Sequence, residues 1–166
     1  MSFLRNPRNL IAIGLLALLV AIAAYATLDM SGSVTSPVPS NFTVNGKTYS
    51  FTYIATDDAQ RAAGLMNKRV TNTTTMLFAF PAMGTYQFWM YDTNTSLDMI
   101  WINATGNTGR VVYVYAGAQP CYSLPILCPN YPTSSSVNYL ANYVIETKAG
   151  FAQANGIEVG TQIQFG

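Results

Sequence analysis

An uncharged apolar run from Leu10 to Leu28, 19 residues long, places the strongest constraint on how this chain folds. As an α-helix it would be about 28 Å long, close to the roughly 30 Å hydrocarbon thickness of a bilayer. A helix with no polar side has nothing to present to water, so the run does not fit the surface of a soluble domain. It therefore predicts a membrane-spanning helix.

Two arginines, Arg5 and Arg8, precede this run, and no acidic residue accompanies them. By the positive-inside rule they keep the N-terminus in the cytoplasm, so the rest of the chain is expected outside it. Residues 24–26 (Ala-Tyr-Ala) also fit a signal-peptide cleavage site. Two interpretations stay open. Residues 1–28 are a retained anchor of a single-pass cell-membrane protein, with the membrane as partner of residues 10–28, or the chain is secreted after cleavage near Ala26.

Two further patterns agree with export. Sequons for N-glycosylation begin at four asparagines, which are Asn41, Asn72, Asn94 and Asn103. Cys121 and Cys128 are the only cysteines, and they enclose a short segment that has prolines within it and on both sides. In an oxidising compartment such a pair predicts a local disulfide, whereas the alternative is two free buried thiols.

The composition excludes several chemistries. The chain has no histidine, which removes Ser-His-Asp and Cys-His catalysis and imidazole metal ligands. Two cysteines are too few for a cysteine-based zinc or iron–sulfur site. Eight basic and seven acidic residues give a net charge of +1 with no basic patch, so no nucleic-acid partner is expected. Phosphate-loop and nucleophile-elbow motifs are also missing, and we expect no metal and no cofactor.

Residues 29–40 (DMSGSVTSPVPS) are a Gly/Ser/Pro-rich linker, and residues 41–166 then form one domain. Asn45 and Gly46 stand between two alternating segments, the strongest short signal for a β-hairpin. Thr56 has the side chain of a helix N-cap and acidic residues follow it, which predicts a short helix over Asp57–Met66.

Short apolar or alternating segments separated by turns continue to the C-terminus. Strands are expected over residues 76–80, 86–91, 97–102, 110–115, 139–147 and 157–165. This spacing predicts a mainly β (β-rich α+β) domain, a compact sandwich or barrel-like fold with one short helix.

The order of the motifs resembles the family named domain of unknown function 192, over roughly Thr43–Phe165. The matching residues are Arg61, Gly64, Leu65, Met66, Met76, Leu77, Phe78, Phe80, Phe88, Trp89, Met90, Leu97, Asp98, Met99, Ile100, Trp101, Ile102, Tyr143, Val144, Ile145, Glu146, Ala149, Gly150, Gly156, Ile157 and Gly160. The resemblance implies a β-rich fold with a short helix, frequently behind a signal or anchor, and implies no activity or cofactor. The chain departs from the family pattern where Tyr91 and Asp92 replace Lys-Asn and Ser96 replaces a proline, so a ligand site in that loop would be altered.

Asp98 lies at the start of an apolar strand, on the same alternating face as Ile100 and Ile102. A buried carboxylate needs a cationic or hydrogen-bonding partner, and Arg61 is the first candidate, with Arg69 second. One interpretation is a structural ion pair or a turn-closing carboxylate that joins helix to sheet. The other is a polar group at the floor of a ligand pocket.

Glu146 lies in the segment 143–147. It could form a carboxylate pair with Asp98, as glycosidases require, or an ion pair with Lys148, Arg110 or Arg61. The aromatic residues between Tyr86 and Trp101 fit core packing, while Trp89 or Trp101 could stack on a carbohydrate. Scattered methionines make a Cu(I) site a minor alternative.

The candidates for a ligand pocket are therefore Arg61, Asp98, Trp89 and Glu146, and no catalytic residue is assigned. The composition favours a non-catalytic module outside the cytoplasm that binds a small ligand, a glycan or an envelope protein. A structural subunit of a cell-surface assembly is the first alternative, because the linker could add to a neighbour's sheet edge. A hydrolase that uses Asp98 and Glu146 is the second.

Overall fold

The computed structural model describes residues 37–133 and 139–166, and residues 37–166 form a unit of their own. The apolar run of residues 10–28, the cleavage site near Ala26 and most of the linker lie outside the described residues. The anchor and the signal peptide therefore both stay predictions. None of the helices in the described part of the chain is long and apolar enough to cross a bilayer.

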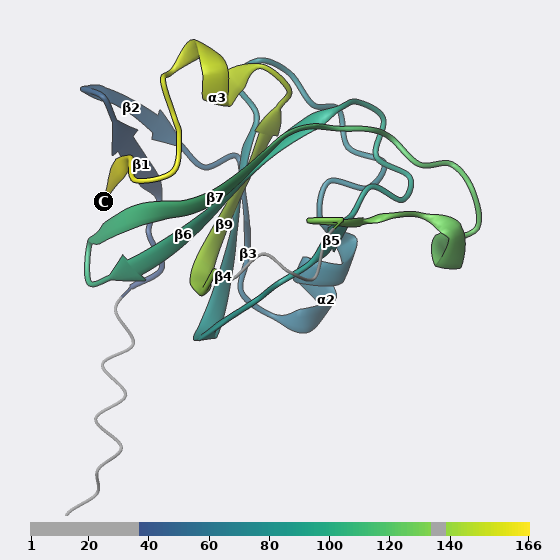
Figure 1. Ribbon diagram of the computed structural model, residues 1–166, viewed down its shortest axis with the longest axis horizontal. Coiled ribbons are helices and arrows are strands. Elements are labelled where there is room, and N and C mark those ends of the chain that lie inside the picture. Colours follow the sequence, from purple (N-terminus) through teal and green to yellow (C-terminus); the bar gives the residue numbers. More distant parts are fainter. Residues whose placement is uncertain (1–36, 134–138) are drawn as a thin grey trace, which may run out of the picture. The chain divides into compact units, whose positions relative to one another are not determined.

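One curled sheet of eight strands dominates the domain (Figure 1). Its spatial order is β2-β1-β10-β7-β6-β9-β4-β3, and every neighbouring pair is antiparallel except β3 and β4. The strands are β1 (Asn41–Val44), β2 (Lys47–Ser50), β3 (Tyr53–Ala55), β4 (Thr75–Gly84), β6 (Leu97–Thr105), β7 (Thr108–Ala118), β9 (Ala141–Lys148) and β10 (Gln162–Phe165). Strands β5 (Phe88–Trp89) and β8 (Asn130–Tyr131) form a separate small sheet.

The mainly β prediction is confirmed, and of the two expected architectures, a sandwich or a barrel-like fold, the single curled sheet is closer to the second. Within residues 37–133 and 139–166 no second large sheet faces the first, and short elements cover it instead. They are α2 (Asp58–Ala63), α3 (Phe151–Ala154), the 3-10 turn η2 (Pro125–Leu127) and the β5–β8 pair. Central strands apolar on both faces require cover on both faces, and their pattern does not specify whether a sheet or a helix supplies it.

The hairpin turn and the short helix that were predicted from local signals are both present. Asn45 and Gly46, with φ of 49° and 77°, form the two-residue turn of the β1–β2 hairpin. The helix begins one residue later than expected and is shorter, since it ends at Ala63. Asp57 rather than Thr56 is its N-cap, and the Asp57 carboxylate accepts a hydrogen bond from the Gln60 N–H at 2.8 Å.

Alternation along the central strands sends side chains into two separate cores. We call the side that packs Met99 and Trp101 of β6 with Leu65, just after α2, the α2 face. We call the side that packs Ile100 and Ile102 with Ala152 of α3 the α3 face. Figure 1 shows α2 and α3 on opposite sides of the sheet. The direction of each strand residue therefore decides which face receives it.

Cys121 and Cys128 form the predicted disulfide. The bridge closes a loop that includes η2 and projects beyond β5 (Figure 1). Four apolar side chains in this loop are more than half exposed: Tyr122, Leu124, Ile126 and Leu127. We call the whole segment from Cys121 to Cys128 the disulfide loop.

Candidate functional site

Glu146 projects from the middle of β9 into the α2 face. It pairs in register with Met76 of β4 and Met99 of β6, so strands flank it on both sides. Only 3% of the residue is exposed. Its side chain borders a cavity of about 20 Å³, which we call the Glu146 cavity. The other lining residues are Arg61, Ala62, Ala63, Gly64, Leu65, Met66, Phe78, Phe88, Trp89 and Thr93.

The carboxyl group of Glu146 has no partner among the described residues. No hydrogen bond or salt bridge joins it to another side chain or to the backbone there, and Arg61 pairs with a different acid. Burial alone raises the pKa of Glu146 to about 8, because removal from water disfavours the charged form and no donor offsets that penalty. A neutral carboxylic acid facing a cavity can both donate and accept a hydrogen bond.

Arg61 lines this cavity and is held in place from several sides. Its Nη1 donates to the carbonyl oxygens of Thr56 and Ala79, each at 2.8 Å. Its Nη2 lies 2.6 Å from an oxygen of Asp58, one turn earlier on α2. The guanidinium also stacks over Phe80, 5.1 Å from the ring centre. These contacts fix α2 against β4 and balance the arginine's charge with the Asp58 carboxylate.

A larger hollow of about 280 Å³ lies beside the Glu146 cavity, and we call it the aromatic pocket. The two share four lining residues, which are Arg61, Ala62, Phe88 and Trp89. Its other walls are Phe80, Tyr86, Gln87 and Asn130. The rings of Phe80 and Tyr86 stack with centres 3.5 Å apart, and Trp89 remains 39% exposed. Together the two hollows place an exposed apolar surface next to a buried acid.

Asp98 behaves differently from Glu146, and the predicted ion pair with Arg61 or Arg69 was wrong. Its carboxylate is buried on the α3 face, where three backbone amides surround it. The Gly117 N–H donates to Oδ1, and the N–H groups of Gly150 and Ala152 donate to Oδ2, all at 2.9 Å. Amides satisfy the charge here because α3 begins directly beneath it, and this element was not foreseen. Asp98 is therefore the turn-closing carboxylate that the sequence analysis gave as one alternative, and not a group at the floor of a ligand pocket.

The two acids do not form the pair that a glycosidase needs. Residue 98 of β6 is opposite Thr147, whereas Glu146 is opposite Met99, so their side chains leave opposite faces of the sheet. The predicted cationic partners of Glu146 are also engaged elsewhere. Lys148 donates to Asn72 at 3.0 Å, and Arg110 donates to the Gly160 carbonyl at 3.2 Å. Successive residues of a strand point to opposite faces, and Glu146 is next to Thr147, the residue opposite Asp98, so the two carboxylates cannot face each other.

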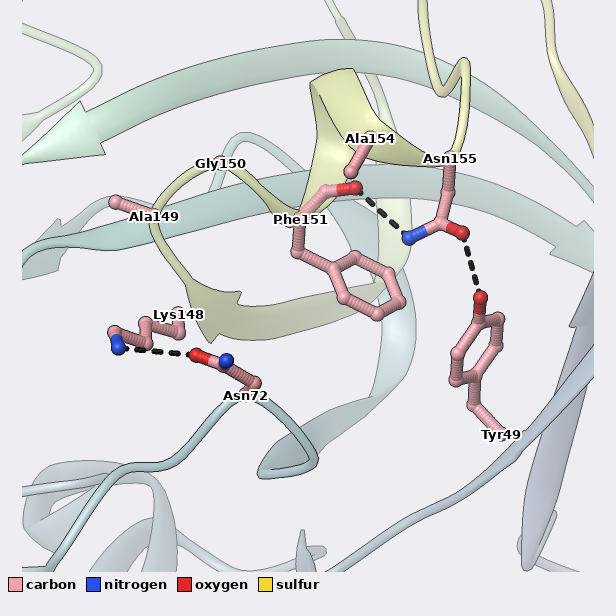
Figure 2. A pocket seen from close by; sticks show the side chains of 8 residues that line it. All are labelled: Tyr49, Asn72, Lys148, Ala149, Gly150, Phe151, Ala154 and Asn155. Atoms are coloured by element: carbon pink, nitrogen blue, oxygen red, sulfur yellow. Dashed lines mark hydrogen bonds between the residues drawn. The ribbon is translucent and has the colours of Figure 1, made fainter.

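A second open hollow, of about 390 Å³, lies around α3 (Figure 2). Its polar side chains bond to one another or to the backbone rather than projecting free into the space. Tyr49 donates to Asn155 at 2.6 Å, Asn155 donates to the Phe151 carbonyl, and Lys148 binds Asn72 (Figure 2). Although it is the larger hollow, it offers no unpaired buried group, so we place the candidate site at the aromatic pocket.

The four sequon asparagines are all accessible to some degree. Asn72, Asn94 and Asn103 are exposed and Asn41 is half-buried. The Asn72 side chain already accepts the bond from Lys148, so a glycan there would lie at the hollow shown in Figure 2. Glycosylation itself stays a prediction.

Three of the four residues named from the sequence therefore meet at one place. Arg61, Trp89 and Glu146 line the Glu146 cavity, and Asp98 does not. Sequence reasoning assigned Phe88 to core packing and gave Phe80 and Tyr86 no role at a site. Their aromatic clustering near Trp89 was the available signal. The amides that bind Asp98 come from a helix of four residues, which is too short to leave a periodic pattern.

Comparisons with known proteins agree with this architecture. The profile of the DUF192 family, described as an uncharacterized ACR, matches residues 41–165. A crystal structure called a "putative transcription regulator" from Sinorhizobium meliloti 1021 is similar at 24% identity and a TM-score of 0.59, over 75% of this chain and 90% of that one. A protein of unknown function from Novosphingobium aromaticivorans DSM 12444 is similar at 25% identity and a TM-score of 0.55, over 76% and 84%. No curated protein matches the chain.

Proposed function

The chain belongs to the DUF192 family, and on that premise we propose that its domain is a non-catalytic module outside the cytoplasm that binds a small ligand in the aromatic pocket. The family has no described activity that could be carried over. The proposal therefore depends on the site itself, and on one residue above all.

The Glu146 carboxyl carries the proposal, because the residue is 3% exposed, borders a cavity and has no hydrogen-bonding partner among the described residues. Burying a polar group without a hydrogen-bonding partner costs roughly 1–3 kcal/mol of folding stability. Perturbed, buried acids beside a hollow are characteristic of functional sites, where a ligand supplies the missing partner. The aromatic pocket supplies the apolar walls that such sites commonly have.

The location outside the cytoplasm is part of the same proposal. It is supported by the apolar run of residues 10–28, by Arg5 and Arg8 before it, and by the Cys121–Cys128 disulfide. We favour a retained membrane anchor over cleavage near Ala26, because the run exceeds the length of an ordinary signal-peptide core.

A screen of small ligands by thermal shift and Trp fluorescence tests the proposal. Trp89 lines the aromatic pocket and is partly exposed, while Trp101 is completely buried, so a ligand in the pocket changes the emission of Trp89. We expect Glu146→Gln to weaken binding of any hit at least tenfold. Glu158→Gln, which alters an exposed glutamate that lines neither the Glu146 cavity nor the aromatic pocket, is the matched control and leaves binding unchanged.

A screen over amines, sugars, organic acids and simple ions in which nothing raises the melting temperature or changes Trp emission would contradict the proposal. So would hits that bind Glu146→Gln as tightly as the wild type.

We propose self-association into a surface assembly as a second candidate function, with a second copy of this chain as the partner. It is favoured by the disulfide loop and its four exposed apolar side chains. No charged residue occurs between Val111 and Ile145. Two identical surfaces meet without like-charge repulsion only if they are uncharged or internally balanced, so this patch suits contact between copies.

Light scattering at increasing protein concentration tests this candidate. We expect the double change Ile126→Ser and Leu127→Ser to lower the association, whereas Val159→Ser, an exposed apolar residue elsewhere, leaves it unchanged. A wild-type chain that stays monomeric at millimolar concentration would remove the candidate.

A further inference from the structure

We propose that the ligand of the aromatic pocket is an organic amine whose ammonium group enters the Glu146 cavity while its apolar body lies against Phe88 and Trp89. This inference rests on the proposed function and narrows it to one chemical class.

The charges around the site favour a cation. Arg61 and Glu146 are the only ionisable residues among those that line the Glu146 cavity. The Arg61 guanidinium already pairs with the exposed Asp58 carboxylate, and its Nη1 is occupied by two carbonyls. An ionised Glu146 therefore adds an unbalanced negative charge, and a ligand with one positive charge neutralises it. A cation favours the ionised form of Glu146, whereas a carboxylate or phosphate ligand would meet a second negative charge whenever Glu146 is ionised.

The size of the Glu146 cavity favours a primary ammonium. At about 20 Å³ it has room for a single group the size of a water molecule. An ammonium is of that size and has three N–H donors, whereas a hydroxyl has one. A trimethylammonium group is much larger than this space and has no donor. The cavity therefore selects among cations as well as between cations and anions.

The walls of the aromatic pocket favour an apolar or flat body next to the charge. Phe88 packs edge-on against Phe78 with ring centres 4.8 Å apart, so its orientation is fixed by the core. A cation within about 6 Å of an aromatic ring centre gains further attraction to the face of the ring. Phe88 and Trp89 line both hollows, so an aryl-ethyl chain can lie on them while its ammonium reaches the acid.

Binding has a defined proton balance. In the free protein the pKa of Glu146 is about 8, so most of the carboxyl is protonated at pH 7. An ammonium nearby favours the ionised form, so the Glu146 proton leaves for the buffer when the amine binds and the amine keeps its own charge. Binding therefore releases most of a proton per ligand at pH 7 and little at pH 9.

Titration calorimetry in buffers of different ionisation enthalpy measures this release directly. The full chain, kept in solution with a mild detergent, is titrated with 2-phenylethylamine, 2-phenylethanol and phenethyltrimethylammonium. We expect the amine to bind at least tenfold more tightly than the alcohol or the trimethylated cation, and to release a proton at pH 7 but not at pH 9. Glu146→Gln removes both the preference and the release, and Glu158→Gln retains both.

The experiments distinguish failure of the amine inference from failure of the proposed ligand-binding function. Equal binding of the amine and the alcohol, or amine binding that releases no proton at pH 7, overturns the amine inference and leaves ligand binding intact. The same holds if none of the three binds while the wider screen finds another ligand that depends on Glu146. Failure of every ligand in both experiments overturns the amine inference together with the proposed function. The wild-type proton release needs no variant, so a poorly folded Glu146→Gln does not block the test.

Discussion

Two buried carboxyl groups on neighbouring strands of this domain have opposite surroundings. Asp98 on the α3 face accepts three backbone N–H bonds at 2.9 Å, while Glu146 on the α2 face has no partner among the described residues. Both are almost fully buried, so exposure does not distinguish them. The difference teaches that a buried acid signals a ligand only when the fold leaves it unsatisfied.

The contrast arises from what the chain places against each face. Gly150, with φ of 92°, turns the backbone so that its own N–H and that of Ala152 both point at Asp98. On the α2 face the nearest main-chain groups already pair within β4, β6 and β9, and the side chains around Glu146 are mostly apolar. Backbone amides of the fold hold the first acid, whereas the second has no partner among the described residues, which is why we propose a ligand for it.

The largest expected effect is on the α3 face. Asp98→Ala removes the acceptor of three N–H groups, of which that of Ala152 is buried and those of Gly117 and Gly150 are partly buried, and should lower the free energy of unfolding by about 3–5 kcal/mol. Denaturant unfolding followed by Trp fluorescence measures it. If that variant does not fold, Asp98→Asn retains one acceptor oxygen and should lose less. A loss below about 1 kcal/mol for Asp98→Ala would break the comparison.

The pH dependence of stability is the next largest effect, and it belongs to Glu146. Its carboxyl ionises near 4.5 when unfolded and near 8 when folded. Between these values the folded protein holds a proton that the unfolded chain has lost. Stability therefore falls as pH rises from about 5 to 8, by up to about 1.4 kcal/mol per pH unit, and levels off above.

Unfolding curves of the wild type and of Glu146→Gln at pH 5, 6.5 and 8 isolate this contribution, because all other groups titrate alike in both. We expect the stability of the variant relative to the wild type to rise steadily across the series. A constant difference between them would mean that Glu146 is neither desolvated nor unpartnered.

A smaller effect, opposite in sign to that of Asp98→Ala, is expected from an apolar replacement of Glu146. Methionine has a similar volume and no polar group to desolvate, so Glu146→Met should raise the free energy of unfolding at pH 8 by about 1–2 kcal/mol. The same denaturant experiment measures it, and ligand binding should be lost at the same time. A variant that is both less stable and still able to bind would contradict the assignment.

The smallest effect concerns the backbone that cradles Asp98. Gly150→Ala meets no neighbouring atom, but its positive φ is unfavourable for a residue with a Cβ, so a loss of about 1 kcal/mol is expected. A double-mutant cycle sharpens the comparison. Gly150→Ala should be non-additive with Asp98→Asn, which shares the contact, and additive with Glu146→Gln on the other face. Additivity with both variants would mean that Gly150 and Asp98 are not energetically coupled.

The sequence was sufficient where the signal was local or periodic. The Asn45-Gly46 turn, the Cys121–Cys128 bridge and the face shared by Asp98, Ile100 and Ile102 are all as predicted. Each depends on residues close together in the chain, where turn chemistry and the two-residue period of a strand act directly.

What the sequence did not give is the pairing of distant segments. Arg61 was assigned to Asp98 because opposite charges attract, but the order of β6, β9 and β4 puts Arg61 on the face of Glu146 instead. The four-residue helix α3 that supplies amides to Asp98 leaves too short a pattern to detect. The choice between a sandwich and a barrel-like fold stayed open for the same reason, because it depends on which distant strands pair.

The hydrogen bonds to Asp98 can be completed only late in folding, because some of their donors lie near the C-terminus. Two of the three donors, the N–H groups of residues 150 and 152, follow β9 in the chain, so a nascent or truncated chain that ends after β9 leaves Asp98 with the Gly117 N–H alone. Water must then enter to solvate that anion, and the sheet stays open to proteases until the last segment arrives. The Asp98 carboxylate thereby couples the β6–β7 pair to the segment that follows β9.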